Sequence, residues 1–203
     1  MRESELAIFP LNTVLFPGGP LTLRIFETRY IDMISRCLKD KSGFGVVAIE
    51  NGTEAGKESS ATTTYDVGTL AEIGDWYTEK DGLLGIVVVG TKRFRIESTR
   101  IQRDGLHVAQ VNYLEAEDTL PVPDDFSYMA ALMESIIDQL GKQYELVDRN
   151  YTDATWLSYR LAEILPLNLR DRQRCLQSND TLERLASLAP VLNALSVEDS
   201  DEE

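Results

Sequence analysis

Few residues of this sequence have the chemistry that catalysis or metal binding requires. The chain has a single histidine, His107, and two cysteines, Cys37 and Cys175, which lie far apart and outside any Cys-x-x-Cys pair. Acid–base and nucleophilic catalysis both need partners held within hydrogen-bond reach. No motif ties a serine, a cysteine or a carboxylate to His107, and isolated cysteines give no metal-ligand spacing. The sequence therefore predicts no catalytic residue, no metal and no cofactor, and it predicts buried, reduced thiols.

A second chemical candidate is the stretch Gly52–Glu58, which contains two glycines and a lysine. A phosphate-binding loop needs four residues between its glycines and a serine or threonine directly after the lysine. Here only three residues separate the glycines, and Glu58 follows the lysine. We therefore expect no nucleotide site and interpret residues 51–61 as a mobile surface loop.

Two groups of large apolar residues are candidates for binding. Phe16, Pro17 and Pro20 belong to a proline- and glycine-rich turn, and Trp76 and Tyr77 belong to an expected strand. Exposed apolar side chains of this kind form grooves that hold an unfolded or extended peptide, or a partner protein. The alternative is that these residues are ordinary core, and the residue types favour it.

A basic run offers a different kind of contact. Arg93, Arg95 and Arg100 belong to the densest cluster of positive charge in the chain. One hypothesis is a nucleic-acid patch, and the other is a solvated strand face balanced by nearby acids. The formal net charge of −14 favours the second, because affinity for a phosphate backbone comes mainly from unneutralised lysines and arginines.

The elements that must position these residues change character once along the chain. Short strands separated by turn signals fill the first part, with one early helix expected at about residues 28–39. Residues 115–124 contain two prolines and four acids, and beyond them apolar residues recur with the helical period. We expect three parts: a β domain over residues 1–118, a helical domain over residues 124–195, and an acidic disordered tail over residues 196–203.

Single residues predict where several elements begin and end. Proline lacks a backbone donor and glycine weakens a strand, whereas short polar side chains cap helices. These residues are Pro10 and Gly90 as strand ends, Thr28, Asp153, Asn168 and Asp180 as helix caps, and Pro190 as a kink or restart of the last helix.

Neither a membrane span nor an export signal is evident. No window approaches the roughly 18 apolar residues that a spanning helix needs. The segment Met1–Glu5 is polar and lacks the basic and apolar regions of a signal peptide. We therefore expect a cytoplasmic protein that has no membrane contact.

Several sequence blocks, in order, resemble the N-terminal domain of Lon proteases. The resemblance covers about residues 5–192, and Gln177 stands where that family usually has glutamate. The order of the blocks makes it specific, since any one alone is weak. The matching blocks are residues 10–18 and 21–30 (PL, VLFPG and LxIFExRY), 44–47, 67–73 (VGTxAxI), 90–96 (GxxRFxI) and 172–185.

This resemblance implies a fold of the α+β class, in which a PUA-like, mostly antiparallel β-barrel is followed by a C-terminal helical bundle. In Lon proteases the domain helps to recognise and hold substrates, and ATPase and Ser-Lys peptidase modules follow it. The domain also occurs in cereblon. Because this sequence has no Walker A motif and no length left for a protease module, we expect a non-catalytic, stand-alone module. It would bind unfolded polypeptide or a partner protein, such as a separate protease. The alternatives are an RNA-binding PUA-like module that uses the three arginines, and an unrecognised hydrolase.

Overall fold

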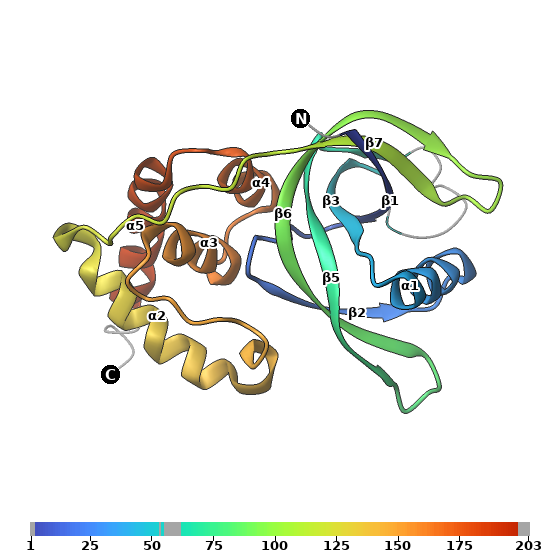
Figure 1. Ribbon diagram of the computed structural model, residues 1–203. Coiled ribbons are helices and arrows are strands. Elements are labelled where there is room, and N and C mark those ends of the chain that lie inside the picture. Colours follow the sequence, from blue (N-terminus) through green and yellow to red (C-terminus); the bar gives the residue numbers. More distant parts are fainter. Residues whose placement is uncertain (1–2, 53, 55–61, 199–203) are drawn as a thin grey trace. The chain divides into compact units, whose positions relative to one another are not determined.

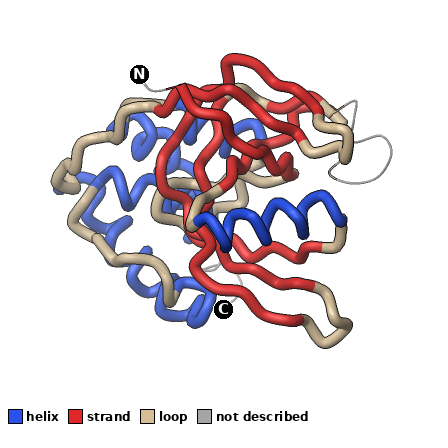
Figure 2. Tube along the Cα trace, turned by 45° about the vertical axis from the view of Figure 1, so that its right-hand side comes forward, coloured by secondary structure: helices blue, strands red, loops and turns tan. Residues whose placement is uncertain are grey.

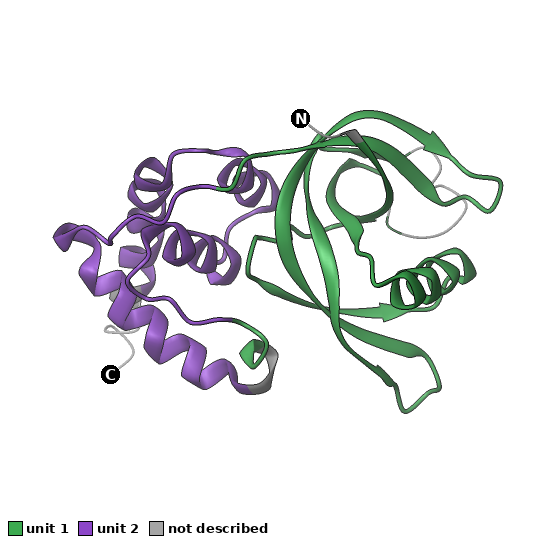
Figure 3. Ribbon diagram, viewed as in Figure 1, with its two compact units in different colours: residues 1–116, 143–147 green, residues 117–142, 148–203 purple. Residues whose placement is uncertain are grey.

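The computed structural model of the 203-residue chain describes residues 3–52, 54 and 62–198. The chain divides into two compact units (Figure 3). Unit 1 comprises residues 1–116 and 143–147, and unit 2 comprises residues 117–142 and 148–203.

Unit 1 contains a seven-stranded sheet and one α-helix (Figures 1 and 2). Adjacent strands follow the order β1-β7-β6-β5-β3-β4, and β2 pairs with β6. All pairings are antiparallel except that of β1 with β3. The elements are β1 (Glu3–Leu11), β2 (Pro20–Ile25), α1 (Thr28–Asp40), β3 (Phe44–Asn51), β4 (Thr63–Thr64), β5 (Val67–Thr78), β6 (Leu84–Ile101) and β7 (His107–Tyr113).

The pairing of β1 closes a ring within this sheet. Because β1 pairs with both β7 and β3, the path β1-β7-β6-β5-β3 returns to its first strand. The strand β3 is buried from Phe44 to Ile49, which explains its nearly continuous apolar sequence. Helix α1 buries Tyr30, Met33 and Ile34 in the same core cluster as Phe44. The predicted combination of a mostly antiparallel sheet with helices is confirmed.

Three local predictions in unit 1 were wrong. Pro10 does not end β1, which continues to Leu11. Strand β7 pairs with β1 only as far as Ile8, so at Pro10 the strand is paired with β3 alone. A strand that is paired on one side only tolerates the missing backbone donor of proline. Gly90 does not end β6. Instead the chain needs glycine there because a Cβ would overlap the carbonyl oxygen of Phe16. Thr28 does not cap α1, because Glu27 occupies the cap position and makes no side-chain cap bond.

Unit 2 is helical, and α3 contacts α2, α4 and α5. Its three predicted caps are confirmed. Asp153 accepts from the Thr155 backbone N–H, Asn168 from that of Asp171, and Asp180 from that of Glu183. The helices are η2 (Asp124–Phe126), α2 (Ser127–Leu140), η3 (Gly141–Tyr144, which straddles the two units), α3 (Ala154–Ile164), α4 (Leu169–Gln177) and α5 (Thr181–Glu198).

The last helix is longer than the sequence suggests. Pro190 lies inside α5 without ending it, so no restart occurs there. The helix also continues to Glu198, past the start of the predicted tail at residue 196, while residues 199–203 lie outside the described part of the chain. Most of the predicted loop 51–61 lies outside it too. None of the helices within the described ranges is long and apolar enough to cross a membrane.

Candidate functional site

The turn residues proposed for an apolar groove belong largely to the interior. Phe16 is completely buried, with 0% of its surface exposed. Pro20 is also buried, at the start of β2, and Pro17 is half-buried. The side chain of Phe16 therefore serves the core of unit 1 and is not available to a bound peptide.

The other two apolar candidates are exposed but lie apart. In β5, Trp76 lies opposite Ile86 of β6, and Tyr77 lies opposite Gly85. Because Trp76 and Tyr77 are consecutive strand residues, their side chains point to opposite faces of the sheet. Trp76 is 59% exposed, whereas the ring of Tyr77 lies over Gly85, where a Cβ would collide with it. The five residues therefore do not come together in one groove, and Trp76 and Tyr77 remain separate candidates.

The three arginines proposed for RNA contact already have counterparts or are buried. Arg95 forms an ion pair with Asp66, with 2.5 Å between Nη1 and Oδ2, and Arg100 forms one with Glu5, with 2.9 Å between Nη2 and Oε1. Arg93 is only 4% exposed. The surface charges of Arg95 and Arg100 are thus compensated by acids, and this arrangement favours a solvated, balanced strand face over a nucleic-acid patch.

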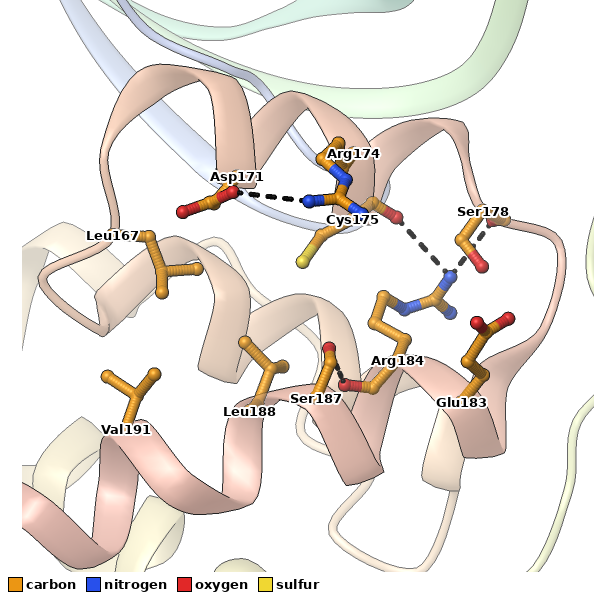
Figure 4. A pocket seen from close by; sticks show the side chains of 10 residues that line it. All are labelled: Leu167, Asp171, Arg174, Cys175, Ser178, Glu183, Arg184, Ser187, Leu188 and Val191. Atoms are coloured by element: carbon orange, nitrogen blue, oxygen red, sulfur yellow. Dashed lines mark hydrogen bonds and ion pairs between the residues drawn. The ribbon is translucent and has the colours of Figure 1, made fainter.

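A cavity of about 400 Å³ lies between α4 and α5 in unit 2 (Figure 4). In the close-up, Leu167, Leu188 and Val191 line one end, and polar groups gather at the other end around Ser178 and Arg184. The groove thus combines an apolar wall with polar groups, as sites that bind peptide side chains do. Its lining is completed by Asp171, Arg174, Cys175, Glu183 and Ser187.

A buried ion pair holds the polar end of this α4–α5 groove. The Arg184 side chain is 0% exposed, and its Nη2 lies 2.8 Å from Oε2 of Glu117. Its Nε donates to Oγ of Ser158 at 2.8 Å, its Nη1 donates to the carbonyl oxygen of Ser178 at 3.1 Å, and the guanidinium stacks on Tyr159 at 4.0 Å. Because its donors are satisfied internally, Arg184 positions α5 and the groove wall.

The cysteine in this groove has a suppressed reactivity. Cys175 is 8% exposed, and burial is the main cause that raises the pKa of its thiol, with Arg184 opposing the shift. A raised pKa keeps the thiol protonated at neutral pH, and the thiolate is the nucleophile. Cys175 is therefore a small apolar group of the wall. Both cysteines are buried and free, as predicted.

A second, smaller groove of about 170 Å³ lies in unit 1 beside β2. Its apolar part includes Phe9 and Tyr30, whose rings stack with centroids 3.9 Å apart, and the exposed Phe26, which is 59% exposed. Burial, the largest cause, raises the pKa of Tyr30 to about 12; Arg29 opposes the shift, and the charges of Glu27 and Glu54 add to it. The groove is therefore apolar inside and has two carboxylates at its rim, of which that of Glu27 is ion-paired with Arg29.

The remaining chemical candidate is also buried. His107 begins β7 and is 9% exposed. Across the described ranges, no group of three or more histidine, cysteine, aspartate or glutamate residues is placed to hold a metal ion.

Sequence reasoning overlooked both grooves. In β2 the inward residues Leu23 and Ile25 lie two positions apart. The apolar Phe26 follows directly, where this alternation predicts an outward side chain, so its position could have marked it as exposed. No local pattern signals the contact of Arg184 with Glu117, which are 67 residues apart in the sequence.

Residues 5–194 match the family of the ATP-dependent protease La (LON) substrate-binding domain. The chain belongs to this family. The Lon N-terminal domain protein from Xanthomonas campestris is 32% identical and superimposes with a TM-score of 0.74, covering 92% of this chain and 98% of its own. The N-terminal domain of the Mycobacterium avium complex Lon protease shares the fold, with a TM-score of 0.61 at 16% identity over 93% of this chain and 97% of its own.

Longer Lon proteases contain the same domain. The Lon protease of Cytophaga hutchinsonii is 27% identical over an alignment of 203 positions that covers 94% of this chain and 24% of that protein. The chain thus spans about a quarter of the length of the curated relatives it matches. Cereblon from Danio rerio is 33% identical over an alignment of 123 positions that covers 59% of this chain and 27% of that protein. Homology to the Lon substrate-binding domain supports a substrate-recognition module.

Proposed function

We propose that this Lon-type domain binds unfolded or extended polypeptide, or a partner protein, and catalyses no reaction itself. The observation that carries the proposal is the family match over residues 5–194. The matching family is named for the domain that binds the substrates of Lon. The α4–α5 groove supports it, since an open cavity with an apolar wall and polar groups suits the side chains of a polypeptide.

The experiment is a fluorescence anisotropy titration of the protein with a labelled, permanently unfolded polypeptide, with a folded polypeptide of similar size as the control. Saturable binding of the unfolded probe alone is expected. Val191→Glu places a charge in the apolar wall of the groove, and Ala194→Glu places the same charge on an exposed position of the same helix. Val191→Glu should weaken binding and Ala194→Glu should not. The absence of binding by the unmodified protein would refute the proposal.

We further propose that the bound polypeptide is passed to a separate protease, with this chain acting as an adaptor. The relatives that share the domain are themselves named Lon proteases, which supports a role next to proteolysis. Adding the purified protein to a protease–substrate mixture from the same cells should accelerate degradation of an unfolded substrate. An unchanged rate would count against delivery while leaving binding intact.

The architecture that positions these surfaces is part of the same proposal. We propose that the ring β1-β7-β6-β5-β3 is the PUA-like barrel and that α2 to α5 form the helical bundle. The double pairing of β1 and the contacts of α3 with three other helices support this description.

A further inference from the structure

The outer edge of β2 is open. Strand β2 pairs with β6 along its whole length, from Pro20 opposite Val89 to Ile25 opposite Leu84. Within the ranges that the structure describes, no other strand pairs with β2. A strand that is paired on one side only presents unused N–H and C=O groups on the other.

The hydrogen-bond pattern shows which backbone groups face this edge. The Gly90 N–H donates to the Gly19 carbonyl oxygen at 2.9 Å, so these two residues form a hydrogen-bonded pair. Such pairs alternate along an antiparallel ladder, so in the unbroken register of β2 the residues Thr22 and Arg24 occupy non-hydrogen-bonded positions. Their N–H and C=O groups therefore point away from β6.

The pairing of β6 with β5 supports the same assignment of the backbone groups. The Glu79 N–H donates to the Leu83 carbonyl oxygen at 2.8 Å at the end of the β5–β6 hairpin. Hydrogen-bonded pairs recur every second residue, so the pair Tyr77 and Gly85, two residues further from the turn, is also hydrogen-bonded. Gly85 is the residue opposite Arg24, so its backbone bonds are directed away from β2, as the first assignment requires.

The 170 Å³ groove runs along this edge. Six consecutive residues, Thr22–Glu27, line it. Side chains of successive strand residues point to opposite faces, so a strand face could contribute only every second residue. An unbroken run of lining residues means that the groove borders the backbone edge itself. Phe9, Leu11 and Tyr30 supply apolar walls from β1 and α1.

The rim of this β2-edge groove carries two carboxylates. Glu27 and Glu54 both line it; Glu27 is ion-paired with Arg29, with 2.8 Å between Oε2 and Nη2, whereas Glu54 accepts a hydrogen bond from the Asn12 backbone N–H. The one arginine of the lining, Arg24, is already paired with Asp81. The whole chain has a formal charge of −14, which favours a cationic over an anionic ligand. A ligand with positive charge next to its apolar groups complements this groove.

We propose that the open edge of β2 binds an extended, cationic peptide as an additional strand. The peptide would pair with the backbone of Thr22 and Arg24, place an apolar side chain against Phe9 and Tyr30, and place a lysine or arginine beside Glu54. Main-chain bonds give affinity for any extended chain, and the groove adds selectivity for alternate side chains. The inference rests on the proposed function and adds to the α4–α5 groove a second binding surface, at the β2 edge, for extended cationic peptides.

The test uses the full chain and a fluorescein-labelled decapeptide of alternating leucine and threonine with lysines at both ends. Two further peptides carry N-methyl groups on every second backbone nitrogen, one on the leucines and one on the threonines. Only one edge of a bound strand pairs with β2, so one methylated peptide should bind at least tenfold more weakly and the other should match the parent. Equal affinity of both methylated peptides would overturn the proposal.

Variants locate the binding edge. Thr22→Pro removes an outward N–H at a position that makes no bond to β6, and Thr22→Val keeps that N–H with a similar shape. Thr22→Pro should bind the decapeptide at least tenfold more weakly, and Thr22→Val should bind within twofold of the original. Circular dichroism and the melting temperature establish that both variants fold. Glu54→Gln retains the acceptor for Asn12 but should weaken binding of the lysine-flanked peptide at low salt.

The outcomes separate this inference from the general function. If Thr22→Pro binds the decapeptide and the unfolded polypeptide as well as the original does, the β2 edge is not the site, although polypeptide binding stands. If the original binds neither probe, both proposals fail. If the original instead self-associates through this edge, and Thr22→Pro abolishes the association, the occupant is a second copy and the peptide proposal is overturned.

Discussion

The buried ion pair between Arg184 and Glu117 offers a severe test of how unit 2 is held together. Arg184→Ala would remove a side chain that is 0% exposed and leave the Glu117 carboxylate, which is 8% exposed, without its cation. Glu117 would retain hydroxyl donors from Tyr159 and Thr181. Breaking a buried pair by removing one partner costs about 3–5 kcal/mol. For a chain of this size, each kcal/mol lowers the melting temperature by about 2–4 °C, so a fall of about 6–20 °C is expected.

Guanidinium denaturation followed by far-ultraviolet circular dichroism measures the change in unfolding free energy. Arg174→Ala is the matched control, because that arginine is 76% exposed and its nearest carboxylate oxygen, on Asp171, is 3.8 Å away. Its effect should stay within about 0.5 kcal/mol.

A double variant identifies the cause. Arg184→Met together with Glu117→Gln removes both charges and leaves neither one buried alone. The double variant should therefore lose at least about 1 kcal/mol less unfolding free energy than the summed losses of the single variants Arg184→Met and Glu117→Gln. A loss of unfolding free energy below about 1 kcal/mol for Arg184→Ala would refute the reasoning. So would additive losses for Arg184→Met and Glu117→Gln.

Three further predictions concern single residues. Asp153→Ala should destabilise unit 2 by about 1 kcal/mol in the same denaturation assay, because Asp153 accepts from the backbone N–H groups of Thr155 and Leu120; an unchanged midpoint would contradict this. Cys175 should react with iodoacetamide at least tenfold more slowly in the native protein than in denaturant, since burial raises the pKa of its thiol; fast native labelling would exclude a buried thiol. Burial raises the pKa of Tyr30 from 10.0 to about 12, so its contribution to stability is complete below pH 10 and is lost as the pH rises toward 12. Tyr30→Phe should therefore lose less stability over that interval, and parallel losses would count against the assignment.

Local sequence is sufficient for some features of this protein. The starts of α3, α4 and α5 are predictable from Asp153, Asn168 and Asp180, because a capping side chain bonds to a backbone N–H two or three residues away. The family is likewise recognisable from ordered blocks that span nearly the whole chain, and residues 5–194 match it. The change from strands to helices follows from the change in apolar period.

Other features depend on which distant segments meet. The acidic stretch after β7 resembles a solvated linker, yet its Glu117 is the buried partner of Arg184 because α5 returns to it 67 residues later. Whether Pro10 and Gly90 end their strands depends on the strands beside them, and so does the open edge of β2. Residue type limits the chemistry of a side chain, but its burial and its partners are set by atoms far away in the sequence, and only the tertiary structure brings those atoms within contact distance.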